Sequence, residues 1–204
     1  MACVFYEEYE SMGNIGYKII LASNSPRRRE LLAGLGYPFE VRVMEGIDES
    51  YPASLPASEV ARYIASKKAA AYRTIIHPDE LIITADTVVI VGDDILGKPE
   101  DEADAVRMLR EISGRTHHVT TGVCLLTAQQ ERCFDVTTEV TFKVLSDEEI
   151  SYYVAKYKPF DKAGAYGIQE WIGYIGVTGL HGSYYNVMGL PVQRIYQELQ
   201  KLRA

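Results

Sequence analysis

Residues 17–36 place a strand pattern directly before a well-marked helix start, and this is the strongest local constraint in the chain. Residues 17–22 form a short apolar run that is typical of a buried strand. Ser25 is a good helix N-cap, and Pro26 suits the first helical position because that position needs no N–H donor. Leucines at helical spacing follow, and Gly36 is typical of a helix end. The segment therefore predicts a strand and a helix in close succession.

Folding does not explain the charge at this predicted helix start. Residues 27–29 are three consecutive arginines, whereas the positive end of a helix dipole favours acidic residues. A bound anion would remove the conflict, because free N–H groups, the hydroxyls of Ser23 and Ser25 and guanidinium groups together suit a phosphate. The alternative is that the arginines are solvated and that Ser25 is only a cap.

The overall charge limits what such a site can bind. The chain has 204 residues, 47% of them hydrophobic and 24% charged, as in ordinary globular proteins. Its 21 Lys and Arg residues stand against 28 Asp and Glu residues, which gives a net charge of −7. Such a chain is unsuited to non-specific binding of a nucleic acid polymer or an anionic membrane, although a local basic pocket is compatible with it. The length suits one domain or two lobes packed across a cleft.

The cysteines and the first residues bear on the compartment. Cys3, Cys124 and Cys133 are odd in number and lack metal-ligand spacing, which argues against a disulfide scaffold and a structural zinc site. Residues 1–15 contain no basic residue and do not resemble a signal peptide, and no apolar run reaches membrane-span length. We therefore expect a cytoplasmic protein with an N-terminal extension over residues 1–16 and a folded domain over residues 17–204.

Asp86 is the most informative single acid. With Thr87 it interrupts two apolar runs, residues 81–85 and 88–91, which have the character of buried strands. A carboxylate at such a position must be paired, bound to metal or exposed in a cleft, because burying it alone is very costly. Asp86 is therefore the best candidate for an acid, a base or a metal ligand. The alternative is a bulge that turns its side chain outwards.

Other polar residues carry weaker signals. Asp48 and Glu49 end an acidic loop and could bind a divalent cation through hard oxygens, although such pairs are usually solvated. Lys68 lies beside Lys67 on a predicted helix, where paired lysines usually face water. Lys98 follows a glycine and precedes a proline, and that loop could aim its ammonium at a phosphate or simply leave it at the surface.

A glycine-bearing loop over residues 158–169 suits a small-molecule pocket. In it, Lys162 could bind a phosphate, and Gln169 offers a paired donor and acceptor for the edge of a nucleobase. The alternative is that Gly164 and Gly167 simply permit a tight turn.

Three further elements are expected from local patterns. Ser58 is the expected cap of a long helix that reaches about residue 77. Ser146 and Glu149 form a capping-box pattern before another helix. Residues 171–180 have the apolar character of a strand.

Taken in order, these motifs resemble the Maf family, which is named for septum formation. The motifs are Ala22-Ser23-Asn24-Ser25-Pro26-Arg27-Arg28, Asp48-Glu49, Lys68-Ala69, Ala85-Asp86-Thr87, Gly97-Lys98-Pro99, Ser113-Gly114-Arg115-Thr116-His117, Asp161-Lys162-Ala163-Gly164-Ala165-Tyr166-Gly167-Ile168-Gln169 and Met188-Gly189-Leu190-Pro191. They run from about residue 18 to the end of the chain, and their ordered sum is far more specific than any one of them.

The resemblance implies a nucleoside triphosphate pyrophosphatase that cleaves between the α- and β-phosphates with the help of a divalent cation. It implies an α/β fold, a mixed twisted sheet with flanking helices and two lobes around a central cleft, like that of inosine triphosphate pyrophosphatases. The double arginine after Pro26 and the Gly-Ile-Gln ending of the loop are similar to the branch that prefers dTTP and UTP. The family also suggests a homodimer.

The resemblance also implies roles for ten residues of this chain. Asp86 would be the proton acceptor and, with Glu49, would hold the metal. The residues that would set base specificity are Arg28, Thr87 and Gln169. Those that would line the phosphate and metal region are Ser23, Arg27, Glu49, Lys68, Lys98 and Lys162.

Elementary chemistry agrees with these roles. Cleaving a triphosphate needs cations over the phosphate oxygens and a base for the attacking water. Magnesium or manganese is the expected ion, because carboxylates and phosphates are hard ligands and no Cys or His cluster competes. Two alternatives stay open: a nucleotide-sensing module linked to cell division that needs no catalysis, and an unrelated hydrolase of sugar phosphates.

Overall fold

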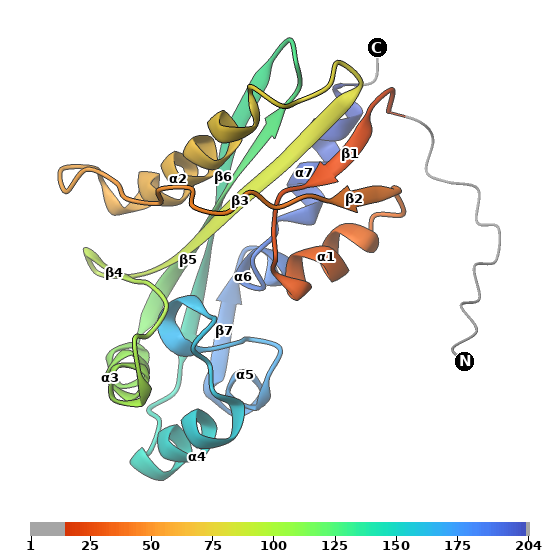
Figure 1. The fold of residues 1–204 in the computed structure, drawn as a ribbon. Coiled ribbons are helices and arrows are strands. Elements are labelled where there is room, and N and C mark those ends of the chain that lie inside the picture. Colours follow the sequence, from red (N-terminus) through yellow and green to blue (C-terminus); the bar gives the residue numbers. More distant parts are fainter. Residues whose placement is uncertain (1–14, 203–204) are drawn as a thin grey trace, which may run out of the picture.

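The computed structural model describes residues 15–202, and its centre is one seven-stranded sheet. The strands are β1 (Lys18–Leu21), β2 (Phe39–Val41), β3 (Glu80–Val91), β4 (Asp94–Leu96), β5 (Thr116–Leu126), β6 (Glu131–Phe142) and β7 (Val177–His181). Their order is β2-β1-β3-β5-β6-β7, with β4 also paired to β3. The β1 strand is parallel to β2 and β3, and the other pairs are antiparallel. The predicted α/β class with a mixed sheet is confirmed (Figure 1).

The helices lie on both faces and at one end of this sheet. They are α1 (Pro26–Ala33), α2 (Ala57–Tyr72), α3 (Glu102–Ile112), α4 (Asp147–Tyr157), η1 (Ala163–Ala165), α5 (Trp171–Gly176), α6 (Tyr184–Val187) and α7 (Val192–Gln200). One apolar core joins α1 and α7 to β1 and to the first half of β3, while α2 packs on the opposite face. A second core joins α3, α4 and α5 to the far ends of the long strands. The strands β3, β5 and β6 therefore run through two lobes (Figure 1).

A gap in the strand pairing of β3 creates the opening between the lobes. On one side, β3 pairs continuously with β5 from Ile82 to Ile90. On its other side it pairs with β1 only up to Ile83 and with β4 only from Val89. Asp86 and Thr87 lie in this gap. The predicted interruption is therefore not a bulge: the strand is continuous, and only its partner on one edge changes.

Local helix signals were confirmed at two starts. The Ser25 hydroxyl accepts the Arg28 N–H at 3.4 Å, and Pro26 is the first residue of α1. Ser146 and Glu149 form a complete capping box at α4. The helix expected from a Ser58 cap to about residue 77 differs at both ends. Its N-cap is Pro56, which makes no side-chain capping hydrogen bond, so the predicted Ser58 cap is wrong, and α2 ends at Tyr72.

The strand expected over residues 171–180 was half wrong. Residues Trp171–Gly176 form α5, and only Val177–His181 form a strand. Burial decides the outcome: Ile172 is fully buried, and a side chain on Gly173 would meet the Ile168 carbonyl oxygen at 1.9 Å. Tertiary packing here overrides the strand propensity of the apolar residues.

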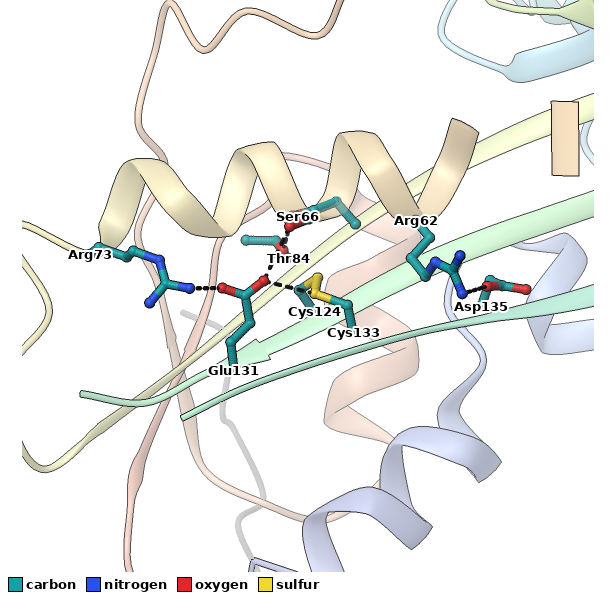
Figure 2. Close-up of a disulfide and its surroundings, with 9 residues drawn as sticks. Arg62, Ser66, Arg73, Thr84, Cys124, Glu131, Cys133 and Asp135 are labelled. Carbon is teal, nitrogen blue, oxygen red and sulfur yellow. Dashed lines mark hydrogen bonds and ion pairs between the residues drawn. A yellow bond between two sulfur atoms is a disulfide. The ribbon is translucent and has the colours of Figure 1, made fainter. Parts of the chain in front are cut away.

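The cysteine count argued against a disulfide scaffold, but one disulfide is present. Cys124 and Cys133 are direct partners across β5 and β6, with Cα atoms 4.1 Å apart, and a disulfide joins them. Figure 2 shows the bond beneath α2, with the Glu131 carboxylate between it and Arg73. Residues that lie far apart on a hairpin become neighbours through strand register, which Cys spacing alone does not reveal.

Two further sequence expectations concern the N-terminal extension and membrane-spanning segments. The predicted extension over residues 1–16 lies almost wholly outside the described residues. Within residues 15–202, no helix is both long enough and apolar enough to cross a membrane.

Candidate active site

The gap beside β3 opens into a cavity of about 780 Å³ between the two lobes. All ten residues that the sequence nominated line it: Ser23, Arg27, Arg28, Glu49, Lys68, Asp86, Thr87, Lys98, Lys162 and Gln169. They come from α1, α2, β3 and four loop regions that lie far apart in the chain. The fold thus brings the nominated side chains to one place.

Asp86 lies at one end of a short chain of charges, with Lys68 between it and Glu49. Its carboxylate accepts a hydrogen bond from the Lys68 ammonium at 2.8 Å, and the same ammonium lies 3.1 Å from Glu49. The side chains of Asp86 and Lys68 are each 15% exposed, so the pair is sheltered but reachable from the cavity. Lys67 points elsewhere, to Asp48. Of the two adjacent lysines, Lys68 is the one that faces the acid.

Arg28 differs from the free phosphate-binding arginine that its place at a helix start suggested. Its guanidinium donates to the carbonyl oxygens of Gly189 (2.8 Å) and Ala85 (3.0 Å) and to the Thr87 hydroxyl (3.1 Å). Burial lowers the pKa of Arg28, and the nearby Asp86 charge opposes that shift. Arg28 therefore ties α1 to the exposed edge of β3 and fixes the orientation of Thr87.

A second group of charges joins the two lobes across the cavity. Arg27, from α1, donates to Asp161 at 2.7 Å, and Asp161 also accepts from Lys162 at 2.6 Å. Burial raises the pKa of Asp161, but hydrogen bonds from Lys162 and Arg27 outweigh it and bring the pKa to about 2. Lys162 also lies 3.2 Å from Glu170. Two cations thus face the cavity while acids hold them in place.

Comparisons with known proteins establish the family of this chain. The family model described as "Maf-like protein" matches residues 18–202. The chain belongs to the Maf-like family. A relative from Phocaeicola vulgatus, named "dTTP/UTP pyrophosphatase", is 64% identical over 186 residues, which span 91% of this chain and 96% of that protein. A relative from Bacteroides thetaiotaomicron with the same name is 57% identical over 192 residues, or 94% of this chain and all of that protein (100%).

A solved structure, that of a HAM1 protein from Coxiella burnetii, also matches this Maf-like protein. The match covers 91% of this chain and 99% of that one, at 13% sequence identity and a TM-score of 0.45. A likeness this distant adds nothing to the family assignment.

Two cavity residues of this Maf-like protein have unused hydrogen-bonding capacity. Within residues 15–202, Lys98 makes no ion pair or hydrogen bond, and its side chain is exposed at the cavity. The Gln169 side-chain oxygen is buried and has no hydrogen-bond partner in the same part of the chain. A buried acceptor without a donor is costly, so both groups are suited to a bound ligand.

Sequence reasoning missed Asp161, Glu170 and Tyr153, which arrange the lysine side of the cavity. Asp161 had a signal, because it begins the motif that ends at Gln169. Glu170 directly follows that motif. Tyr153 had none, since a tyrosine on the apolar face of a helix is most simply a core residue.

The lining also bears on metal binding. Five basic side chains and four acidic ones line the cavity, the acids being Glu45, Glu49, Asp86 and Asp161. Glu49 and Asp86 both approach the Lys68 ammonium, so their oxygens face a common point. Two carboxylates suit Mg²⁺, which usually takes few protein ligands together with phosphate oxygens and water.

A separate grouping of potential ligands does not compete with this pair. Among the described residues, the one cluster of three His, Cys, Asp or Glu ligands is Cys124, Glu131 and Cys133. Its cysteines are joined in the disulfide, so they offer no thiolate.

Proposed function

We propose that this Maf-like protein hydrolyses dTTP and UTP to the nucleoside monophosphate and pyrophosphate. The observation that carries the proposal is the convergence of one sheltered carboxylate, Asp86, with basic side chains from both lobes in a single cavity. Eight relatives at 50–64% identity bear the name dTTP/UTP pyrophosphatase. No feature of the cavity favours a sensing module, which would need no acid at this position.

In this proposal Asp86 accepts a proton from the attacking water. It lies at the open edge of β3, where a carboxylate can reach a bound molecule, and the Lys68 ammonium stabilises its negative charge at 2.8 Å. A positioned general base typically contributes about 10²–10⁴ to a rate. Arg27, Lys98 and Lys162 would stabilise the charge that develops on the phosphate oxygens.

Gln169, Arg28 and Thr87 would select the base. Thymine and uracil share one ring N–H flanked by two carbonyl groups, and the unpartnered Gln169 oxygen is suited to accept that N–H. Arg28 holds the Thr87 hydroxyl at 3.1 Å, which would fix the opposite edge of the base pocket. A ring without that N–H would leave the buried Gln169 oxygen unpaired, and this supports discrimination against cytosine.

A divalent cation, Mg²⁺ or Mn²⁺, would be held by Glu49 and Asp86. The five basic and four acidic side chains of the lining leave little net positive charge, whereas a triphosphate carries about four negative charges. When bound, the ion would supply the missing positive charge beside the phosphates.

We further propose that the enzyme acts in the cytoplasm, where nucleoside triphosphates are made, and that it forms a homodimer.

A panel of triphosphates with product identification tests the function. The purified protein is supplied with Mg²⁺ or Mn²⁺ and with dTTP, UTP, dCTP, dATP or dGTP, and its products are separated by ion-exchange chromatography. The expected products are pyrophosphate and a monophosphate, with dTTP and UTP turned over fastest. Release of orthophosphate instead would reject the cleavage position, and no turnover of any triphosphate would reject the enzyme.

A further inference from the structure

Lys162 is held by two carboxylates of different character. Asp161 has a side chain that is 57% exposed, and it shares its charge with Arg27 on the other lobe. Glu170 has a side chain that is only 20% exposed, and it lies 3.2 Å from the ammonium. Asp161 lines the cavity, so an entering phosphate can replace its contacts, whereas Glu170 is not among the lining residues.

Glu170 is in turn fixed by Tyr153. The Tyr153 hydroxyl donates to the second oxygen of the Glu170 carboxylate, and the Tyr153 side chain is fully buried on α4. Glu170 is the N-cap residue of α5, yet among the described residues its side chain makes no capping hydrogen bond. Its carboxylate therefore serves the tyrosine and the lysine and not the helix that it precedes.

The same hydroxyl also fixes the backbone that leads to Gln169. It accepts the N–H of Gly167 at 3.0 Å. A side chain at Gly167 would come within 2.9 Å of the Glu170 carboxyl carbon, so the glycine makes room for this carboxylate. One phenol oxygen thus joins the segment that carries Gln169 to the acid that holds Lys162.

We propose that Tyr153 and Glu170 are positioning residues of the active site. Tyr153 positions Lys162 on the phosphate side of the site and Gln169 on its base side. This inference rests on the proposed function, because it assigns Lys162 to the phosphates and Gln169 to the base. It predicts that the two residues affect different properties. Glu170 positions Lys162 alone, whereas Tyr153 positions both Lys162 and Gln169.

The test compares Tyr153→Phe and Glu170→Gln with two control variants. Tyr152→Phe removes a hydroxyl on the exposed face of the same helix, where its partner is Lys156. Glu111→Gln neutralises an acid that pairs with Arg107 on α3 and does not line the cavity. For each protein, kcat and KM are measured with dTTP and dCTP. Calorimetry with a non-hydrolysable α,β-imido analogue of dTTP gives the affinity and the fraction of competent sites.

Glu170→Gln should lower kcat for dTTP about tenfold without raising KM, because the lysine loses its fixed position while the cavity loses a negative charge. Its preference for dTTP over dCTP should stay at the wild-type value. Tyr153→Phe should lower kcat by a similar factor and should also reduce that preference severalfold. A purely structural role would reduce only the fraction of competent sites, and a ratio of two substrates does not depend on that fraction.

Wild-type kcat and wild-type base preference in a fully competent Tyr153→Phe protein would overturn the proposal. If Tyr153→Phe does not fold, Glu170→Gln decides, and an unchanged kcat there overturns it. If the wild-type protein hydrolyses no triphosphate, the proposed function fails. The positioning role is then decided by the relative affinities for the imido analogues of dTTP and dCTP: Tyr153→Phe must reduce the preference for the dTTP analogue, and Glu170→Gln and both controls must not.

Discussion

Glu198 and Asp86 are both carboxylates withdrawn from solvent, but the structure treats them differently. The Glu198 side chain is 2% exposed, and it accepts from three cations: Arg132 at 2.6 Å, Lys201 at 2.8 Å and Arg194 at 2.9 Å. Asp86 is 15% exposed, and one ammonium contacts it. Glu198 is surrounded by three donors, from β6, from α7 and from the residue that follows α7, whereas one donor leaves Asp86 with unused acceptor capacity towards a cavity.

The difference separates an acid that stabilises the fold from one that is available for chemistry. A buried carboxylate that already accepts from three cations has little capacity left for water or metal, and removing it leaves its donors without an acceptor. Asp86 shares its Lys68 partner with Glu49, so its one ion pair is already divided. Substitution of Glu198 should therefore affect stability, and substitution of Asp86 should affect turnover.

The largest expected effect is that of Asp86→Asn on turnover. Loss of the proposed base should lower kcat about 10³-fold, while the urea midpoint stays close to that of the wild type. Steady-state release of pyrophosphate from dTTP measures kcat, and equilibrium unfolding measures the urea midpoint. Asp135→Asn is the matched control, because Asp135 lies on the same ladder row two strands away and pairs with Arg62. Activity within a few-fold of wild type would remove Asp86 from its role.

Glu198→Gln should have the opposite profile. Its three partner cations are 41–56% exposed and can return to water, so we expect a loss of about 1–3 kcal/mol in the free energy of unfolding. The kcat of the folded fraction should not change. Urea titration followed by circular dichroism measures the loss, with Glu139→Gln, an exposed acid on β6, as the control. A kcat that falls with stability unchanged would reverse the assignment of the two acids.

Acid titration sharpens the same contrast. Burial raises the pKa of Glu198, but hydrogen bonds from Lys201, Arg132 and Arg194 outweigh it and bring the pKa to about 2. A carboxyl with a depressed pKa in the folded state contributes its full stability above its ordinary pKa of 4.5 and loses it as the pH falls towards about 2. The urea midpoint should therefore fall more steeply below pH 4.5 in the wild type than in Glu198→Gln. Parallel curves for the two proteins would contradict this.

The smallest expected effect is that of reducing the disulfide on catalysis. Cys124 lies two residues from Gly122, which pairs with Asp86, but neither cysteine lines the cavity. Treatment with a thiol reductant should change kcat by less than about twofold, because the bond joins strands that are already paired. Thiol counting under denaturing conditions should find two more thiols after reduction than before. A large loss of activity on reduction would show that the Asp86 site also depends on the disulfide.

Local chemistry predicted parts of this molecule well. The Ser25 and Ser146 caps follow from short-range hydrogen bonding, which a sequence displays directly. The charge conflict at residues 27–29 and the acid within an apolar strand both pointed to the cavity that the fold forms. The ordered Maf motifs then nominated ten residues that line it.

Features that depend on register and packing could not be predicted in this way. The partner of each cysteine is set by how β5 pairs with β6, and α5 forms because its glycine packs against Ile168. The Arg28 guanidinium can donate to the Ala85 carbonyl because β3 has no strand partner on that edge beyond Ile83. Tyr153 resembles any core tyrosine until the loop that it contacts is in place.

The central claim is that side chains from both lobes bind one triphosphate, and a binding comparison tests it most directly. Affinity for the non-hydrolysable dTTP analogue with Mg²⁺ is measured by calorimetry for the wild type, Arg27→Ala, Lys162→Ala and the control Arg110→Ala. Arg110 is a surface residue that pairs with Asp147. Each cavity variant, one from either lobe, should bind at least about tenfold more weakly, while the control binds as the wild type does. Wild-type affinity in either cavity variant would contradict the claim.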